Sequence, residues 1–240
     1  MSRLIPYCRF SSEEKRELFE FIVDIGIPIN QEGKPNWGEI REKFYAYNSK
    51  YDAKSVNLIE KIVQEFRMIC QQIIQRHNYS QKVSAEEASR FKVSPTSLDV
   101  SPEEAEQFYH HTNLLKFIRK TILFNDRQLF KTYQDEYLEE VAALAPENPA
   151  YIGNQGYKPE VQDLTLLLFL SENGFNRLDE IKNDPVYGFN KLGLTEEKLL
   201  ARIAFICDFF KAQLDKTSRI SVICRGSQEE EDRQDNPGRN

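Results

Sequence analysis

The chain of 240 residues is long enough for one large or two small domains with buried cores. Its composition, 40% hydrophobic and 29% charged, excludes a fibrous or wholly disordered protein. The formal net charge of −6 excludes DNA binding through the field of the whole molecule, so any contact with nucleic acid has to use local basic patches.

Few residues of this chain interrupt helices, since Gly and Pro number only 10 each, and this favours helices over a turn-rich β architecture. No apolar run approaches the roughly 18 residues needed to cross a bilayer, and the first ten residues lack the apolar stretch of a signal peptide. The four cysteines are widely spaced without a C-x-x-C pair, which is typical of reduced thiols in an intracellular protein. These are Cys8, Cys70, Cys207 and Cys224.

A three-helix block is predicted for residues 1–77. Ser11, with a glutamate three residues later, has the spacing of a capping box, and the helix that follows ends at Gly26. A short second helix begins near Trp37, and a long third helix covers about 54–76, with apolar residues at helical intervals. We expect the core of this block to contain three aromatic side chains, Phe19, Trp37 and Phe66.

Two different segments follow the first block. Residues 78–101 are polar and predict a flexible or loosely docked linker. Residues 102–157 predict a helical spacer, because Pro102 follows Ser101 at a favoured helix start and a helical stripe of apolar residues comes after it. We expect this spacer to pack against a neighbouring block.

A second block with a similar plan is predicted for residues 158–224. An apolar helix ends at Gly174, a short helix stops before Pro185, and Thr195 caps a third helix that runs to about Leu214. The two blocks therefore share one order of elements, which indicates a weak internal duplication. The acidic segment 225–240 predicts a disordered tail.

These segments together predict an all-α fold, in which two tri-helical, Myb/SANT-like helix-turn-helix blocks are joined by a helical spacer. Within it, three groups of residues carry a resemblance to one known family. The first group is similar to the SANT domain of the chromodomain–helicase–DNA-binding (CHD) chromatin remodellers, the second to the helix that joins two domains there, and the third to the start of the SLIDE domain. The first group includes Phe10-Ser-Ser-Glu-Glu-Lys, Trp37 and Met68-Ile69-Cys70. The second group is Asn113-Leu-Leu-Lys-Phe-Ile-Arg-Lys. The third group includes Asp163-Leu-Thr-Leu-Leu, Asn173-Gly174-Phe175 and Asp184-Pro185.

The resemblance covers roughly residues 10–215 and implies a nuclear, non-catalytic module that binds duplex linker DNA and nucleosomes beside a separate ATPase. The sequence departs from the family pattern at Asn173, where the family has a histidine before the glycine. No G-x-x-x-x-G-K-[ST] phosphate loop occurs in the sequence, so the motor would be attached elsewhere or supplied by a partner subunit. The negative net charge keeps a second interpretation open, a module that binds basic histone tails or partner subunits with little affinity for DNA.

The third helix of each block is the expected recognition element. Lysine and arginine can neutralise phosphate, and glutamine can bond to phosphate or a base edge. On the first block the candidates are Lys54, Lys61, Gln64 and Arg67, and the alternative is a face that only meets solvent, because Glu60 and Glu65 share it. On the second block Lys198 and Arg202 share a stripe with Phe205 and Phe209, which is either a basic and aromatic contact surface or a face packed against the spacer.

The densest basic cluster lies on the spacer and comprises Lys116, Arg119 and Lys120. Its position between the two blocks favours contact with the DNA backbone, although such clusters often only face solvent.

No enzymatic activity, cofactor, metal site or small-molecule substrate is expected. The adjacent pair His110-His111 points to different faces of a helix, so it cannot form the i, i+4 pair that binds zinc. The sequence also lacks the nucleophile, phosphate-loop and zinc-protease motifs.

Overall fold

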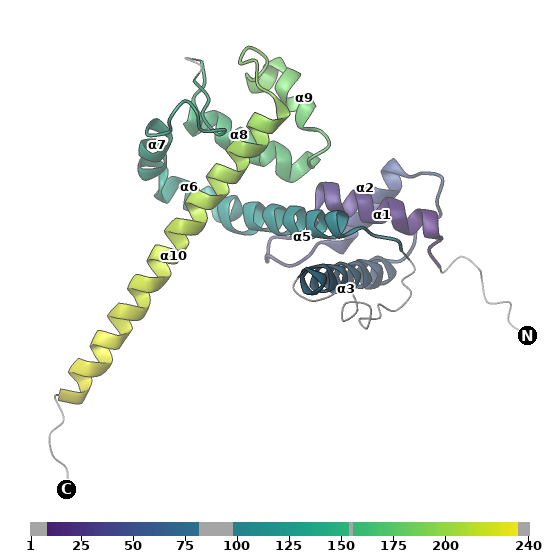
Figure 1. The fold of residues 1–240 in the computed structure, drawn as a ribbon, viewed down its shortest axis with the longest axis horizontal. Coiled ribbons are helices and arrows are strands. Elements are labelled where there is room, and N and C mark those ends of the chain that lie inside the picture. Colours follow the sequence, from purple (N-terminus) through teal and green to yellow (C-terminus); the bar gives the residue numbers. More distant parts are fainter. Residues whose placement is uncertain (1–8, 82–97, 154–155, 235–240) are drawn as a thin grey trace, which may run out of the picture. The chain divides into compact units, whose positions relative to one another are not determined.

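The computed structural model describes residues 9–81, 98–153 and 156–234, and every named element in these ranges is a helix (Figure 1). An isolated antiparallel bridge joins Ile29 and Pro35, and the described ranges contain no strand. The all-α class is therefore confirmed. Within the same ranges, no helix combines the length and apolar character needed to span a membrane.

The chain divides into two compact units. Unit 1 comprises residues 1–127 and 167–181, and unit 2 comprises 128–166 and 182–240. One boundary between the units falls within helix α8 (Pro159–Asn173), so the segment 158–224 is shared by both units instead of forming one of its own. This division differs from the predicted one because tertiary contacts of the segment after Leu166, described below, tie it to helices far away in the sequence.

The described part of unit 1 contains four long helices, whose starts follow local capping rules. The hydroxyls of Ser11, Ser55 and Ser101 each accept a hydrogen bond from the backbone three residues on, and at Ser101 the reciprocal bond from Glu104 completes a capping box. The helices are α1 (Ser12–Ile25), α2 (Trp37–Tyr47), α3 (Val56–Ser80) and α5 (Pro102–Phe117).

The core of unit 1 is built from aromatic rings on three helices. Phe19 of α1 stacks on Phe108 of α5 at 5.3 Å between ring centroids and meets Phe66 of α3 edge-on at 5.4 Å. Phe19 and Phe66 are buried as predicted, whereas Trp37 is only half-buried at the start of α2, where Ile40 takes the buried position.

The predicted spacer packs against the first block, as expected. Helix α5 lies along both α3 and α1 (Figure 1). The end of the predicted polar linker also joins this core, because Leu98 and Val100 are buried there. The linker prediction is wrong for these residues and for 78–80, which continue α3; residues 82–97 lie outside the described part of the chain.

The spacer is helical but interrupted. It continues from α5 as a π-helical turn, η2 (Ile118–Ile122), and then as α6 (Phe124–Thr132) and α7 (Gln134–Ala142). The π geometry is marked by the hydrogen bond from the Leu123 amide to the Ile118 carbonyl, at 2.9 Å.

The remaining helices are α8, α9 (Leu178–Asn183), the short η3 (Pro185–Tyr187) and α10 (Glu196–Gln234). Helix α10 extends beyond Leu214, where the third helix was expected to end, and includes residues 225–234 of the predicted tail. Adding residues to an existing helix needs no new nucleation, and Glu, Gln and Arg favour helix, so the helix extends into the acidic segment. Residues 235–240 lie outside the described ranges.

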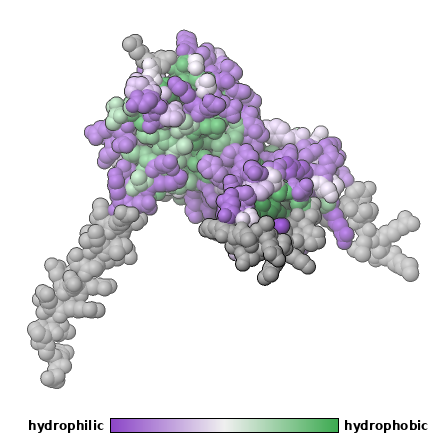
Figure 2. Space-filling model, viewed as in Figure 1, coloured by the Kyte–Doolittle hydropathy of each residue, from purple (hydrophilic) through white to green (hydrophobic). Residues whose placement is uncertain are grey.

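Hydrophilic residues cover most of the face shown in Figure 2, and hydrophobic residues are visible between them. Large apolar side chains that are exposed on the described residues include Met68 of α3 and Val186 of η3. Isolated side chains of this kind are normal on a protein surface.

Candidate nucleic-acid interface

Helix α3 presents a polar face to solvent. Lys61 and Gln64 are exposed and Arg67 is half-buried, so all three predicted candidates on this helix are accessible. Arg67 also anchors the helix, because its backbone carbonyl accepts a hydrogen bond from the Tyr109 hydroxyl at 2.9 Å. Its guanidinium is not needed for this contact.

The C-terminal part of α3 carries no carboxylate. The sequence from Phe66 to Ser80 contains no Asp or Glu, and its exposed residues are mainly amides and Arg76. The last carboxylate before it, Glu65, pairs with Lys15 of α1 at 3.5 Å between Lys15 Nζ and Glu65 Oε1. The exposed amides are Gln64, Gln71, Gln72, Gln75 and Asn78. The helix itself therefore adds no negative charge along this part, and Asp99 is a carboxylate from another segment that lines a pocket with Arg76 and His77.

Lys54 does not belong to this face. It precedes α3, its side chain is buried, and its Nζ lies 3.6 Å from a carboxylate oxygen of the buried Glu14. Glu14 also accepts a hydrogen bond from the Tyr45 hydroxyl at 3.1 Å. The prediction of a DNA contact at Lys54 is therefore wrong, because a buried ion pair inside unit 1 holds its ammonium group.

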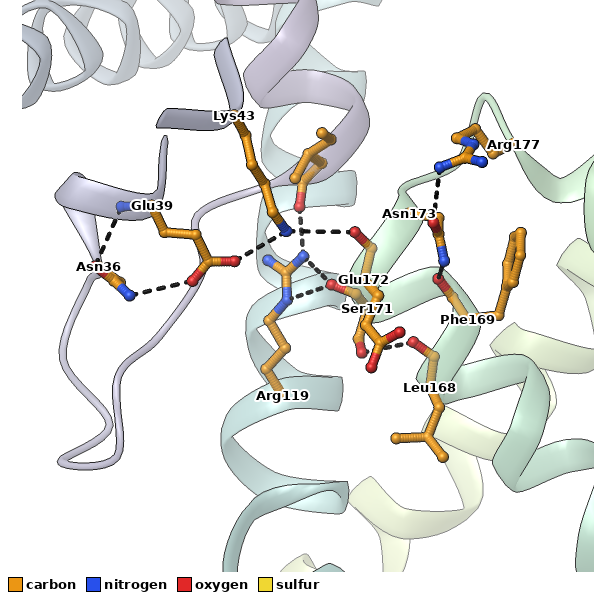
Figure 3. Close-up of polar contacts among 11 residues, drawn as sticks. Asn36, Glu39, Lys43, Arg119, Leu168, Phe169, Ser171, Glu172, Asn173 and Arg177 are labelled. Carbon is orange, nitrogen blue, oxygen red and sulfur yellow. Dashed lines mark hydrogen bonds and ion pairs between the residues drawn. The ribbon is translucent and has the colours of Figure 1, made fainter. Parts of the chain in front are cut away.

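The spacer cluster is divided by burial. Lys116 and Lys120 are exposed, whereas Arg119 is buried beneath them. The Arg119 guanidinium donates to the carbonyl of Ile25 at 2.6 Å through Nη2, and to the carbonyl of Ser171 at 3.1 Å through Nε (Figure 3). Arg119 is thus a structural residue of unit 1, and its prediction as a phosphate contact is wrong.

The bonds of Arg119 join the C-terminal ends of two helices. Ile25 is the last residue of α1, and Ser171 lies in the last turn of α8. Both ends carry unsatisfied carbonyls and partial negative charge, which a cation stabilises. Lys43 of α2 adds a contact to the Glu172 carbonyl at 3.5 Å (Figure 3). These contacts place 167–181 in unit 1.

Both helix ends require glycine. Gly26 has φ +67°, and a Cβ built there would lie 2.8 Å from Leu115 Cδ1. Gly174 has φ +81°, and its Cβ would lie 2.7 Å from the Asp24 carboxylate, which accepts the Asn176 amide at 2.7 Å. The two glycines that suggested an internal duplication are therefore the positions where these helix ends approach neighbouring groups closely.

In unit 2, Lys198 is exposed, whereas Arg202 is almost completely buried. The Arg202 guanidinium forms two bonds to the carboxylate of Asp163, at 2.8 and 2.7 Å, and a third to the Ala150 carbonyl at 3.2 Å. The prediction of Arg202 as a DNA contact is wrong, because this forked geometry uses the guanidinium inside the core.

Aromatic residues complete this buried ion pair. The hydroxyls of Tyr137 and Tyr157 both donate to Asp163, the first at 2.6 Å. Burial and the neighbouring carboxylate raise the pKa of both tyrosines far above its usual value, so both stay protonated. Phe205 and Phe209 pack on Tyr137 of α7, so the stripe on α10 is a packed face of unit 2 rather than an exposed contact surface.

A second polar site lies between α1 and α5 in unit 1. A cavity of about 330 Å3 is lined by Glu20, Asp24 and Glu104 beside Arg16, and the His111 ring closes it by stacking on Phe175 at 3.8 Å. Burial raises the pKa of Asp24 and lowers that of His111, which favours uncharged forms of both groups. Among the described residues no His, Cys, Asp and Glu cluster could hold a metal ion.

Sequence reasoning missed three residues that organise these sites: Asp24, Lys43 and Asp163. Asp163 had a detectable signal, because it is a lone carboxylate in a strongly apolar stretch and such a residue requires a buried partner. Asp24 and Lys43 act on backbone groups far away in the sequence, which no local pattern shows.

No protein-family model, curated protein or solved structure matches the chain. The kinship with CHD remodellers therefore stays a prediction based on the motifs alone.

Proposed function

We propose that the chain is a non-catalytic module that binds the backbone of duplex DNA in chromatin, with the exposed face of α3 as its main contact. The observation that carries this proposal is the run from Phe66 to Ser80, which has cations and amides but no carboxylate although the chain as a whole is acidic. Lys61 and Gln64 extend the same face toward the start of the helix. The resemblance to SANT–SLIDE regions supports a nuclear role beside a separate ATPase subunit.

The contact would be to phosphate rather than to specific bases. Lysine and arginine side chains bind phosphate without reading sequence, and glutamine adds hydrogen bonds to phosphate or base edges. Lys116, Lys120 and Lys198 are further exposed cations on the described residues, and Lys116 and Lys120, four residues apart, share one face of the spacer. We rank them below the α3 face.

Binding of the full chain to a duplex of about 30 base pairs, measured by fluorescence anisotropy across a salt series, tests this proposal. If the three cations of this face, Lys61, Arg67 and Arg76, contact phosphate, the slope of log K against log salt is about −3. The double substitution Lys61→Glu and Arg67→Glu should weaken binding at least about tenfold, because it replaces two attractive charges by repulsive ones.

Lys191→Glu is the control, since Lys191 is exposed and belongs to unit 2, whereas α3 belongs to unit 1. Equal loss of affinity in this control, or a binding constant that does not respond to salt, would contradict the proposal.

A basic peptide such as a histone tail is the second candidate ligand. The specific observation in its favour is the cavity lined by Glu20, Asp24 and Glu104, in which Arg16 pairs with both glutamates. The alternative outcome is a chain that shows no affinity for DNA and binds a lysine-rich peptide, with weaker peptide binding in the variant Glu20→Gln. That result would replace DNA by a basic peptide as the ligand.

A further inference from the structure

A pocket of about 600 Å3 opens in unit 1 beside Arg119. One wall is apolar and the other end is polar. The apolar residues are Pro28, Ile29, Leu123, Phe124 and Leu168, and the polar end includes Glu39, Lys43 and Arg119. A pocket with this division fits a ligand that has an apolar body and one polar head.

Arg119 borders this pocket with an unpartnered donor. Its side chain is only 9% exposed, and its Nη1 has no hydrogen-bond partner. Figure 3 shows this nitrogen on the side of the guanidinium away from Ser171, facing the side on which Glu39 and Lys43 lie. Buried donors are normally bonded, so an orphaned one at a pocket wall marks a place where an acceptor is favoured.

At the polar end of the pocket, no carboxylate of the described residues is hydrogen-bonded to the Arg119 guanidinium. Lys43 pairs with Glu39 at 2.9 Å, whereas Arg119 has only backbone carbonyls as acceptors on the described residues. Desolvation lowers the pKa of Arg119 to about 10, and the charge of Glu39 opposes this shift only in part. Glu172 lines the pocket as well, but its side chain is exposed, so water screens its charge.

Local backbone geometry supports a binding role here. Arg119 is the second residue of the π-helical turn η2, and single π-helical turns occur frequently at functional sites. The turn directs Arg119 toward the end of α1 while Leu123, one residue beyond it, lines the apolar wall.

We propose that this pocket binds a carboxylate attached to an apolar body, with the carboxylate between Lys43 and Arg119 and the apolar body against Ile29, Leu123 and Leu168. The long 3.5 Å contact from Lys43 to the Glu172 carbonyl is the one that the ligand replaces. The site is separate from the α3 face, so it does not depend on DNA binding.

Titration calorimetry of the full chain with 4-phenylbutyrate tests the site, and 4-phenylbutanamide provides a neutral ligand of the same shape. The acid should bind at least about tenfold more tightly than the amide, because only the acid offers a charged acceptor to the unbonded Arg119 nitrogen. An acetylated, amidated Leu-Glu dipeptide distinguishes a carboxylate on a peptide from a free small acid. Equal affinity of acid and amide, or no binding of any of the three, would overturn the proposal.

Three variants locate the site. Lys43→Gln should weaken binding of the acid about fivefold or more, and Lys61→Gln, an exposed lysine outside the pocket, should leave it unchanged. Glu39→Gln should strengthen binding, because it removes the carboxylate that competes for Lys43; a perturbation of the fold would not do this.

Lys61→Gln lowers affinity for DNA if the α3 proposal holds, so the two proposals fail or succeed independently. An unchanged affinity in both Lys43→Gln and Glu39→Gln contradicts the assignment.

Discussion

Burial removes most of the hydration of a guanidinium group, and Arg119 and Arg202 recover this loss in different ways. Arg202 has a carboxylate partner, Asp163, whose remaining oxygen lone pairs accept two tyrosine hydroxyls. Arg119 has the partial charges of two helix C-termini instead and keeps one unbonded nitrogen. The first arrangement is satisfied and structural, whereas the second leaves capacity for a ligand.

Asp163→Asn should lower the free energy of unfolding of unit 2 by about 3–5 kcal/mol, because it leaves a buried guanidinium without its counter-charge. Chemical denaturation followed by circular dichroism measures this loss. The double variant Asp163→Asn with Arg202→Met should recover part of it, since no buried charge then remains. A single variant that loses less than about 1 kcal/mol would show that the pair is not a main contact of unit 2.

At the scale of elements, helix ends decide how unit 1 is assembled. The N-termini are set by local serine caps, while the C-termini of α1 and α8 depend on Arg119 and on close approach at two glycines. An element can therefore form from local sequence and still need a distant residue to satisfy its last turn.

Gly174→Ala should destabilise unit 1 by about 2 kcal/mol or more, because the new methyl group adds a clash with Asp24 to the strain of a positive φ. Gly33→Ala is the matched control, since Gly33 has φ +72° but its nearest neighbour is the flexible end of Lys120 at 3.6 Å. Thermal unfolding of both variants separates the clash from the backbone strain. Equal shifts in Tm would mean that close approach at Gly174 contributes nothing.

At the scale of the molecule, unit 1 combines segments that are far apart in the sequence, 9–127 and 167–181, among the residues described. His111 lies at their contact, where it stacks on Phe175 and bonds the Val23 carbonyl at 3.1 Å. Charge at this contact would have to be buried, so the docking of 167–181 depends on the neutral imidazole.

Unit 1 should lose stability as the pH falls below 6.5, the ordinary pKa of histidine. The folded state holds the pKa of His111 lower, so protons bind preferentially to the unfolded chain. Asp24 has a raised pKa and acts with the opposite sign at more acidic pH. Urea unfolding between pH 7.5 and 5.5, monitored by Trp37 fluorescence, should show a decline that His111→Gln reduces. An identical decline in that variant would assign the effect to other groups.

Several features of the protein could be predicted from sequence because they are local. Apolar periodicity placed α2 and α3, serine caps also marked the starts of α1 and α5, and the aromatic pattern identified Phe19 and Phe66 as core residues. Trp37 was misjudged because a residue in the first turn of a short helix can lie at the edge of a core, whatever its hydrophobicity.

The sequence by itself determined the helical class, most helix starts and the exposed cations of α3. Only the tertiary structure decided which basic residues are available to a ligand. Lys54, Arg119 and Arg202 look like Lys61 in a helical projection, but each is covered by a second element that supplies its partner. The physical reason is that the charge of a side chain is a local property, whereas its burial depends on residues that are distant along the chain.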